Sequence, residues 1–343
     1  MSTSTKPARA GAALGAAPGV APGSPDPLAV LKPEHRGLWA KPVEDRPLIW
    51  VNGKLVPKSE AVVSVYDHGL LYGDGVFEGI RVYKGKIFKL QSHMDRLYRC
   101  AEKISLRIPI SAEEMVGVQR LCIEANGIED GYIRLVVTRG YGTLGLDPRK
   151  CPVPGVVCIA DQISLYKPEF YQTGMRVVVA KRPKTPVACL DPRVKSLNYL
   201  NNILAKVEAI NAGCDEAIML SSDGWVTECT GDNLFFIKGG TIFTPPNTTG
   251  DSGSLEGVTQ KFVRDEVIPA CGLKCVTKEV RLDEILRADE VFLTGTAAEM
   301  IAVSEIDNTD GKRHAIGQGE GPVTKKLRAR FREIVTGAVI PEN

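Results

Sequence analysis

Residues 193–200 read Arg-Val-Lys-Ser-Leu-Asn-Tyr-Leu and place Lys195 between a proline-containing loop and the start of a helical pattern. The pattern consists of large apolar residues at helical spacing, namely Leu200, Ile203, Leu204, Val207 and Ile210. A lysine in isolation is ordinarily a solvated surface charge. Lys195 becomes a candidate for covalent chemistry when the same chain also offers a suitable acid and a binding site for an anion.

An acid and two anion-binding turns are available elsewhere in the chain. Glu228 stands at the end of a short apolar hairpin, although spacing alone favours an ordinary turn or edge-strand glutamate. Residues 255–259 precede a helical pattern, and residues 294–299 follow a buried strand pattern. Gly and Thr in both segments can present N–H and hydroxyl groups to an anion, or simply cap a helix. Arg96 can add a fixed positive charge.

Composition and charge set the broad class of the protein. The 343 residues, of which 43% are hydrophobic and 24% charged, are typical of a globular chain with two domains. A formal net charge of +2, without a basic face or tail, argues against nucleic-acid binding. The four histidines lack metal-ligand spacing, which predicts that there is no metal site. The nine cysteines lack a CxxC pair, which predicts reduced thiols in a cytosolic protein. No apolar run approaches the ~20 residues of a membrane helix.

Four regions follow from the distribution of residue types. We expect residues 1–45 to be a disordered tail and lead-in segment, because its first thirty residues almost lack large apolar side chains. An organellar transit peptide is the less favoured interpretation of this acid-poor stretch. Residues 46–163 predict a small α+β domain, 164–174 an interdomain linker, and 175–343 a large domain.

Periodicity predicts the main elements of both domains. In the first domain we expect hairpins over 48–56 and 76–88, helices over 90–104 and 112–126, and strands over 132–138 and 156–160. In the second domain we expect strands over 176–180, 216–220, 233–237, 241–244 and 290–293, and helices over 200–210, from about 257, and over 323–335. Residues 248–254 predict a flexible surface loop.

Five motifs in a fixed order resemble the class IV aminotransferases, the fold-type IV pyridoxal-phosphate enzymes. They occupy residues 67–79, 93–97, 195–199, 228–235 and 295–299. The resemblance runs from about residue 51 to 335 and implies a two-domain α+β fold. In such a fold the larger domain has a β-barrel-like core, and the cofactor, pyridoxal 5'-phosphate, lies at the interface. The sequence departs from the family pattern at Gln260, where a basic residue is usual, and in the longer segment around 248–254.

The resemblance also implies roles for individual residues. Lys195 would be the Schiff-base lysine and the proton shuttle, Glu228 would pair with the pyridine nitrogen, and Tyr199 would bond the ring hydroxyl. The residues implied for the cofactor phosphate and its surroundings are Arg96, Val258, Thr259, Gly295 and Thr296. The backbone amides of Thr296 and Ala297 would receive the substrate carboxylate.

Within the family, residues 77–83, 131–134 and 145–149 resemble the branched-chain aminotransferases. That group implies an apolar pocket formed by Phe77, Tyr132 and Tyr166, with the cation Arg134 beside it. It also implies a homodimer or higher homo-oligomer in which Tyr72 enters the pocket of a second subunit.

We therefore expect transamination of branched-chain L-amino acids (leucine, isoleucine, valine) with 2-oxoglutarate, in cytoplasmic amino-acid biosynthesis. The alternatives are a D-amino-acid aminotransferase, an aminodeoxychorismate lyase, and a non-catalytic cofactor-binding protein. An intact set of Lys195, Glu228 and Thr296 argues against the last, because binding alone does not need a proton-shuttling amine.

Overall fold

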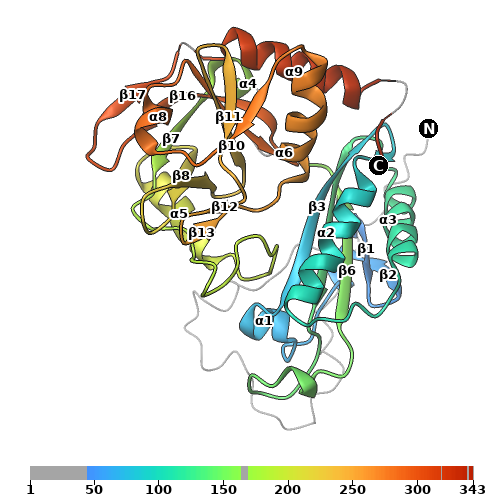
Figure 1. Ribbon diagram of the computed structural model, residues 1–343. Coiled ribbons are helices and arrows are strands. Elements are labelled where there is room, and N and C mark those ends of the chain that lie inside the picture. Colours follow the sequence, from blue (N-terminus) through green and yellow to red (C-terminus); the bar gives the residue numbers. More distant parts are fainter. Residues whose placement is uncertain (1–44, 164–168, 318, 338–339, 343) are drawn as a thin grey trace, which may run out of the picture. The chain divides into compact units, whose positions relative to one another are not determined.

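The computed structural model describes residues 45–163, 169–317, 319–337 and 340–342. The predicted tail up to residue 44, and residues 164–168 of the predicted linker, lie outside the described residues. Within the described part, helices and strands form an α+β arrangement with two large sheets (Figure 1).

The first sheet has six strands in the order β2-β1-β6-β5-β3-β4. Its strands are β1 (Leu48–Val51), β2 (Lys54–Pro57), β3 (Gly75–Tyr83), β4 (Lys86–Ile87), β5 (Gly131–Thr138) and β6 (Gly155–Asp161). Neighbouring strands are antiparallel throughout. Asn52 and Gly53 turn the first hairpin with φ of 48° and 90°. Two positive φ values in succession match the right-handed twist of paired strands, as the Asn-Gly pair predicts.

Two helices, α2 (Leu90–Lys103) and α3 (Ala112–Asn126), lie against this sheet (Figure 1). Helix α3 begins with a capping box, in which Ser111 and Glu114 each bond the other's backbone N–H. Helix α2 buries the residues that recur at helical spacing, including Leu90, Met94 and Leu97. Shorter helical turns are η2 (Lys58–Glu60), α1 (His68–Tyr72) and η3 (Pro148–Lys150).

The second sheet follows the order β14-β11-β10-β15-β16-β7-β8-β9, with β17 beside β16. Its strands are β7 (Met175–Val179), β8 (Glu216–Leu220), β9 (Val226–Cys229), β10 (Asn233–Lys238), β11 (Thr241–Thr244), β14 (Cys275–Thr277), β15 (Glu290–Gly295), β16 (Glu299–Asp307) and β17 (Arg313–Ala315). Only three residues join the edge strand β9 to β10 in the middle of the order. The sheet must therefore curl back on itself into a partial barrel, as predicted for the larger domain.

The helices around this sheet are mostly short. They are α4 (Phe170–Thr173), α5 (Leu200–Asn211), α6 (Val258–Phe262), the π-helical η4 (Val263–Val267), α7 (Ile268–Ala270), α8 (Leu282–Leu286) and α9 (Pro322–Val335). Phe235 and Phe292 stack at 4.9 Å in the buried cluster beneath α9. Helix α4 lies inside the segment that the sequence predicted as a linker.

Two local predictions differ from the structure, and one predicted helix has an exposed apolar face. The flexible loop over 248–254 is wrong, because β12 (Thr248–Thr249) and β13 (Ser252–Gly253) form a hairpin in which Thr249, Ser252 and Ser254 are fully buried. Residues 295–299 turn between the antiparallel strands β15 and β16 rather than starting a helix. The apolar face of α5 is present but points outward, so that Leu200, Ile203 and Ile210 are each more than half exposed.

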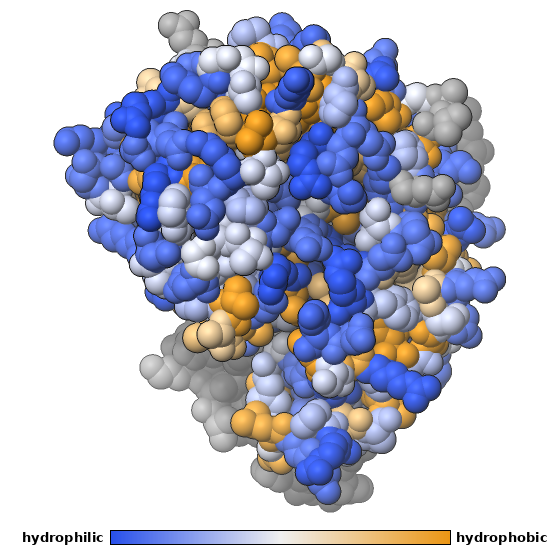
Figure 2. All heavy atoms as spheres, in the orientation of Figure 1, coloured by the Kyte–Doolittle hydropathy of each residue, from blue (hydrophilic) through white to orange (hydrophobic). Residues whose placement is uncertain are grey.

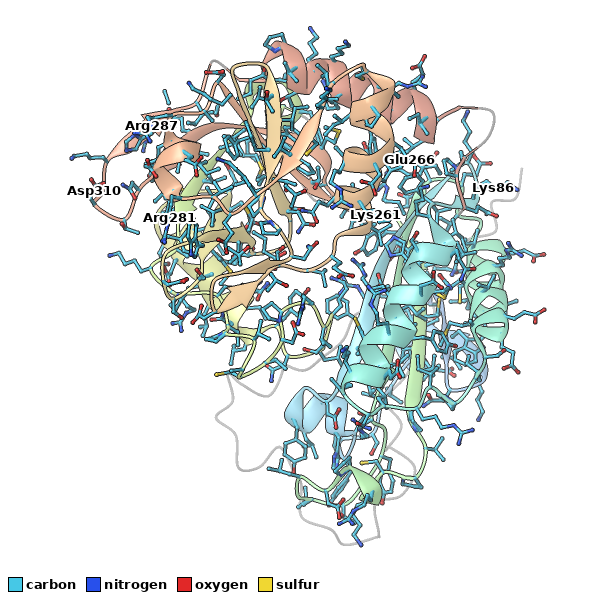
Figure 3. All side chains as sticks on the ribbon, in the orientation of Figure 1. Lys86, Lys261, Glu266, Arg281, Arg287 and Asp310 are labelled. Atoms are coloured by element: carbon cyan, nitrogen blue, oxygen red, sulfur yellow. The ribbon has the colours of Figure 1, made fainter. Side chains whose placement is uncertain are left out.

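The surface is otherwise ordinary for a globular chain. Figure 2 shows a mostly hydrophilic face with scattered hydrophobic residues. Charged side chains such as Arg287 and Asp310 project outward at the edge of the view in Figure 3. Among the described residues, no helix combines the length and apolar character that a bilayer crossing requires.

Candidate active site

A cavity of about 290 Å³ lies between elements of the two sheets. Of the predicted site residues that the structure describes, all but Glu228 and Tyr72 line it. Those that do are Phe77, Arg96, Tyr132, Arg134, Lys195, Tyr199, Val258, Thr259, Gly295, Thr296 and Ala297. The structure thus brings together side chains that are up to 220 positions apart in the sequence.

The main chain around Lys195 is attached to strand β3. The N–H of Phe77 donates to Lys195 O at 3.0 Å, and the N–H of Leu197 donates to Gly75 O at 2.9 Å. The N–H of Lys195 itself points to Cys100 Sγ at 3.3 Å. The loop before α5 is therefore fixed where it presents the lysine to the cavity.

The amine of Lys195 lies among aromatic rings. Its Nζ is 3.2 Å from Tyr199 Oη and 4.3 Å from the centroid of the Phe77 ring. Burial, followed by the positive charge of Arg96, lowers the pKa of Lys195 to about 8. A substantial fraction of neutral, nucleophilic amine is thus present near physiological pH.

Tyr199 is kept as a neutral phenol. Burial, followed by the negative charge of Glu228, raises the pKa of Tyr199 above its usual value. Its ring meets Phe77 edge to face at 5.0 Å between centroids. The hydroxyl can therefore serve as a hydrogen-bond donor in the cavity at any physiological pH.

Arg96 is fixed by a partner that the sequence analysis did not identify. Its Nε and Nη2 donate to the two oxygens of Glu78, each at 2.7 Å, and His93 Nδ1 lies 2.8 Å from the same carboxylate. Burial raises the pKa of Glu78, but Arg96 and then His93 outweigh it and hold this pKa well below its usual range. Glu78 and His93 lie inside the motifs at residues 67–79 and 93–97, but the sequence alone did not indicate that they would pair with Arg96.

Glycines open the end of the cavity near α6 and the β15–β16 turn. A Cβ on Gly257 would lie 1.9 Å from Asn233 Oδ1, and one on Gly295 would lie 1.9 Å from Asp232 Oδ1. The absence of a Cβ at both positions therefore lets the Asn233 and Asp232 side chains pack directly against the backbone. Nearby, Thr294 lines the cavity with a buried Oγ1 that has no hydrogen-bond partner in the described part of the chain. An unpartnered buried hydroxyl of this kind fits a polar ligand group.

The opposite wall combines aromatic rings with a cation. Tyr132 and Arg134 both line the cavity, which confirms that alternate residues of β5 share a face. The guanidinium carbon of Arg134 is 4.8 Å from the Phe77 ring centroid and 5.7 Å from that of Tyr132. Gly79 makes room for this wall, because a Cβ there would lie 1.7 Å from Tyr132 Oη.

Two predicted residues lie elsewhere. Glu228 is one layer behind the cavity, where its Oε2 accepts from Asn233 Nδ2 at 3.2 Å and from Leu255 N at 3.1 Å. Tyr72 is on α1, and its hydroxyl accepts from the N–H of Gly145 at 3.0 Å. Tyr166 falls outside the described residues. In the described part of the chain, no group of three or more His, Cys, Asp or Glu side chains could hold a metal ion.

Comparison with known proteins places this geometry in a family. The family model of the class IV amino-transferases matches residues 75–306. The chain is 46% identical over 291 residues to a putative branched-chain-amino-acid aminotransferase of Methanocaldococcus jannaschii, an alignment that covers 84% of this chain and 96% of the relative. A D-alanine aminotransferase of Listeria monocytogenes is 34% identical, with coverage of 84% and 96%. The aminodeoxychorismate lyase of Bacillus subtilis is 32% identical, with coverage of 85% and 96%.

Solved structures of the same family are also similar to this chain. The T.th. branched-chain amino acid aminotransferase with pyridoxamine 5'-phosphate is 36% identical and superposes with a TM-score of 0.78, covering 85% of this chain and 95% of that one. The same enzyme complexed with N-(5'-phosphopyridoxyl)-L-glutamate gives 35% identity and a TM-score of 0.77 at the same coverage. The predicted α+β architecture of fold type IV is thereby confirmed, and the chain belongs to the class IV aminotransferase family.

Proposed function

We propose that this aminotransferase transfers the amino group of branched-chain L-amino acids (leucine, isoleucine and valine) to 2-oxoglutarate. The observation that carries the proposal is the placement of Arg134 over the Phe77 ring and beside Tyr132, inside the cavity that holds Lys195. The relative of greatest identity named above is a putative enzyme of this substrate class. The proposal has four parts: cofactor, substrate, assembly and cellular location.

As a class IV aminotransferase, the enzyme uses pyridoxal 5'-phosphate. The cavity fits this group, because it combines a buried amine on Lys195 with Arg96 and the hydroxyls of Thr259 and Thr296. Lys195 would hold the cofactor covalently. Its phosphate would be held by Arg96, Val258, Thr259 and Thr296. When bound, the cofactor supplies an electron-withdrawing ring that stabilises negative charge on the substrate α-carbon.

The remaining residues have distinct tasks in this proposal. The Nζ of Lys195 would carry the proton to and from the substrate α-carbon. The Tyr199 hydroxyl would donate a hydrogen bond to the oxygen on the cofactor ring. Glu228 would hold a proton on the ring nitrogen of the cofactor. The amides of Thr296 and Ala297, in the turn after β15, would bind the substrate α-carboxylate.

The cavity must accept two kinds of side chain in turn. Leucine is apolar, whereas glutamate, which 2-oxoglutarate becomes, ends in a carboxylate. A buried carboxylate without a partner would cost several kcal/mol. The Phe77 and Tyr132 rings suit the apolar chain, and Arg134 lies within reach to pair with the carboxylate. The glutamate conjugate held by the T.th. enzyme is consistent with this exchange.

Two other activities are represented among the relatives, and one assay separates them. Purified enzyme with pyridoxal phosphate and 2-oxoglutarate is offered L-leucine, L-isoleucine, L-valine, D-alanine and aminodeoxychorismate in separate reactions. We expect turnover of the three branched-chain L-amino acids. Consumption of D-alanine alone would favour a D-amino-acid aminotransferase, and pyruvate release from aminodeoxychorismate alone would favour the lyase.

We also propose a homodimer in which Tyr72 completes the cavity of the second subunit. Large apolar side chains are exposed together in residues 62–72 and 141–146, with Leu70 at 61% and Leu144 at 69%. Exposed apolar residues that are grouped rather than scattered are typical of a protein interface. The test mixes Tyr72→Ala subunits with Lys195→Ala subunits. If Tyr72 acts across the interface, a mixed dimer regains one intact site and activity returns. If activity does not return, Tyr72 serves its own chain.

The proposal places the enzyme in the cytoplasm, in the synthesis of branched-chain amino acids. All nine cysteines are free, as a reducing compartment requires. Localisation of a tagged full-length chain by cell fractionation would check this part, and recovery in an organelle would contradict it.

A further inference from the structure

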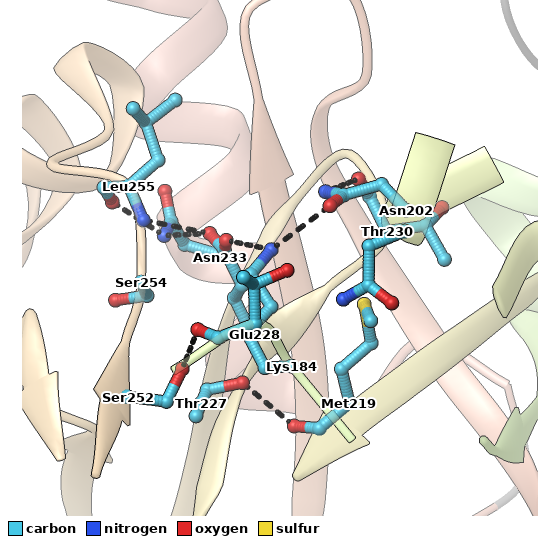
Figure 4. Close-up of polar contacts among 12 residues, drawn as sticks. Lys184, Asn202, Met219, Thr227, Glu228, Thr230, Asn233, Ser252, Ser254 and Leu255 are labelled. Atoms are coloured by element: carbon cyan, nitrogen blue, oxygen red, sulfur yellow. Dashed lines mark hydrogen bonds and ion pairs between the residues drawn. The ribbon is translucent and has the colours of Figure 1, made fainter. Parts of the chain in front are cut away.

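A buried ion pair lies directly behind the cavity wall. Lys184 Nζ is 2.6 Å from Glu228 Oε1, and the two side chains are only 3% and 7% exposed (Figure 4). The other oxygen of Glu228 accepts from Asn233 Nδ2 and from the N–H of Leu255, both of which belong to residues that line the cavity. Three N–H donors therefore converge on this carboxylate and fix the positions of both of its oxygens.

Lys184 is itself held from several sides. The main-chain N–H of Lys184 donates to Leu220 O at 2.7 Å, at the end of β8. The carbonyl of the next residue, Thr185, accepts from Ser252 Oγ at 2.7 Å, so the buried β12–β13 hairpin anchors the same loop. Asn202 Oδ1, from α5, is 3.4 Å from the ammonium. Strand β8 and the β12–β13 hairpin therefore fix the main chain at Lys184, and Asn202 contacts its ammonium beside Glu228.

We propose that Lys184 is a positioning residue of the cofactor site, which supplies the buried counter-charge of Glu228 and holds its carboxylate in one orientation whether or not the cofactor is bound. The proposal rests on the assignment of Glu228 to the ring nitrogen. A buried carboxyl that lacks a counter-charge takes up a proton instead of remaining ionised. A neutral carboxyl cannot stabilise a protonated ring nitrogen as an anion does. Lys184 thus acts on the cofactor through Glu228, without touching it.

Other charged groups face the same region and must be separated from this effect. Burial lowers the pKa of Lys195 and raises that of Tyr199, and the charge of Glu228 raises both. Asp191, in the loop before Lys195, lines the small cavity that Lys184 and Glu228 share and is paired with Arg193 at 2.8 Å. Substitutions at Lys184 leave all of these groups in place, namely Lys195, Tyr199, Asp191 and Arg193. Differences between the variants therefore report on the Lys184–Glu228 pair.

The first experiment uses the cofactor-free protein. Lys184→Met keeps the bulk of the side chain but removes its charge, and should lower the melting temperature at pH 8 by about 5 °C or more. The loss should be smaller near pH 5.5. In the variant, folded Glu228 retains a proton that the unfolded chain has released, so stability falls as pH rises. The double variant Lys184→Met/Glu228→Gln should lose this pH dependence, and Lys184→Arg should melt close to the wild type.

The second experiment measures the cofactor. By equilibrium dialysis, Lys184→Met should bind pyridoxal phosphate about tenfold more weakly, as expected for the loss of one charge-assisted interaction. The acid limb of its kcat/KM profile should move to higher pH, since Glu228 then ionises only there, and Lys184→Arg should restore both. Lys181→Met is the matched control, because Lys181 is exposed in the same segment.

The outcomes distinguish the two proposals. If Lys184→Met melts like Lys181→Met, with unchanged cofactor affinity, Lys184 has no positioning role. If Lys184→Met shows pH-dependent destabilisation but Glu228→Gln binds cofactor and absorbs light like the wild type, the ion pair exists and Glu228 does not face the ring nitrogen. That result overturns both assignments. If Glu228→Gln is impaired and Lys184→Met is not, only the role of Lys184 falls.

Discussion

Glu78 and Arg96 form a buried two-pronged ion pair that joins strand β3 to helix α2, with 0% and 3% of their side chains exposed. The third nitrogen of the guanidinium, Nη1, donates to Glu256 O at 2.8 Å, in the turn before α6. One side chain therefore connects the strand that carries Phe77, the helix above it and the turn implied in phosphate binding. The Arg96 side chain is held in this position by the carboxylate of Glu78.

Substitution of Glu78 tests this connection. Glu78→Gln should reduce the free energy of unfolding by about 3 kcal/mol, because Arg96 would keep a buried charge without its counter-ion. Chemical denaturation of the cofactor-free protein measures the change. Glu102→Gln, at an exposed position of the helix that carries Arg96, is the control and should stay within about 0.5 kcal/mol of the wild type. Equal losses in the two variants would contradict a special role for Glu78.

The same pair predicts how stability depends on pH. Burial raises the pKa of Glu78, but Arg96 and His93 bring it below its ordinary value of 4.5. Below that value the unfolded chain binds a proton that the folded chain does not, so the contribution is complete above about pH 5 and declines in more acidic solution. The denaturation midpoint of the wild type should fall more steeply below about pH 5 than that of Glu78→Gln. Parallel curves would show that other carboxylates dominate.

Lys195 should be the residue that bonds the cofactor. Lys195→Ala should lose the visible absorption band of the attached cofactor, whereas Lys181→Ala, which removes an exposed amine, should keep it. In the wild type, stopped-flow attachment of pyridoxal phosphate should accelerate as pH rises through about 8, because the neutral amine is the nucleophile. A persistent band in Lys195→Ala would assign the bond to another lysine.

Periodic elements could be predicted because their local signals agree with their packing. The apolar repeat of α2 and the Ser-x-x-Glu start of α3 are visible in the sequence, and both coincide with the observed helix bounds. The motifs also located most of the cavity lining. Strand β16 was missed because the small residues before it resemble a helix start. In the structure, Glu299 instead adopts a positive φ of 59° in a tight turn.

Long-range polar pairing could not be predicted from the sequence. The polar run at 248–254 has the composition of an exposed loop, yet Ser252 finds its partner 67 residues away at Thr185. Lys184, in a proline-containing loop, has every local sign of a solvated lysine, and only the fold brings Glu228 to it. Both cases depend on contacts between segments whose spacing carries no periodic signal.

Gly79 should control the shape of the substrate wall. In Gly79→Ala the new Cβ would lie 1.7 Å from Tyr132 Oη, so the Tyr132 ring must move from its position in the cavity wall. We expect kcat/KM for leucine to fall at least about tenfold, by analogy with the loss of 1–3 kcal/mol of apolar contact. Gly117→Ala, in α3, is the control, since its Cβ would meet nothing within 4 Å. A normal kcat/KM in Gly79→Ala would exclude Tyr132 from the substrate pocket.

Arg134 should separate the two half-reactions. Its guanidinium lies over the Phe77 ring, where it can meet the distal carboxylate of glutamate but has no polar group to meet on leucine. Arg134→Ala should therefore slow the glutamate half-reaction at least about tenfold more than the leucine half-reaction, since a charge-assisted bond contributes about 1.5–3 kcal/mol. Single-turnover absorbance follows each half separately, because the two cofactor forms absorb at different wavelengths.

A control and an alternative complete this test. Arg107→Ala removes an exposed arginine and should leave both half-reactions unchanged. If Arg134→Ala slows both halves equally, the residue supports the cavity wall rather than the glutamate carboxylate. Arg81 and Arg139 would then be the next cations to substitute, but both already face carboxylates, at 3.6 Å and 2.8 Å. Either would have to leave its partner to bind glutamate, which is why Arg134, whose neighbours are aromatic rings, is the stronger candidate.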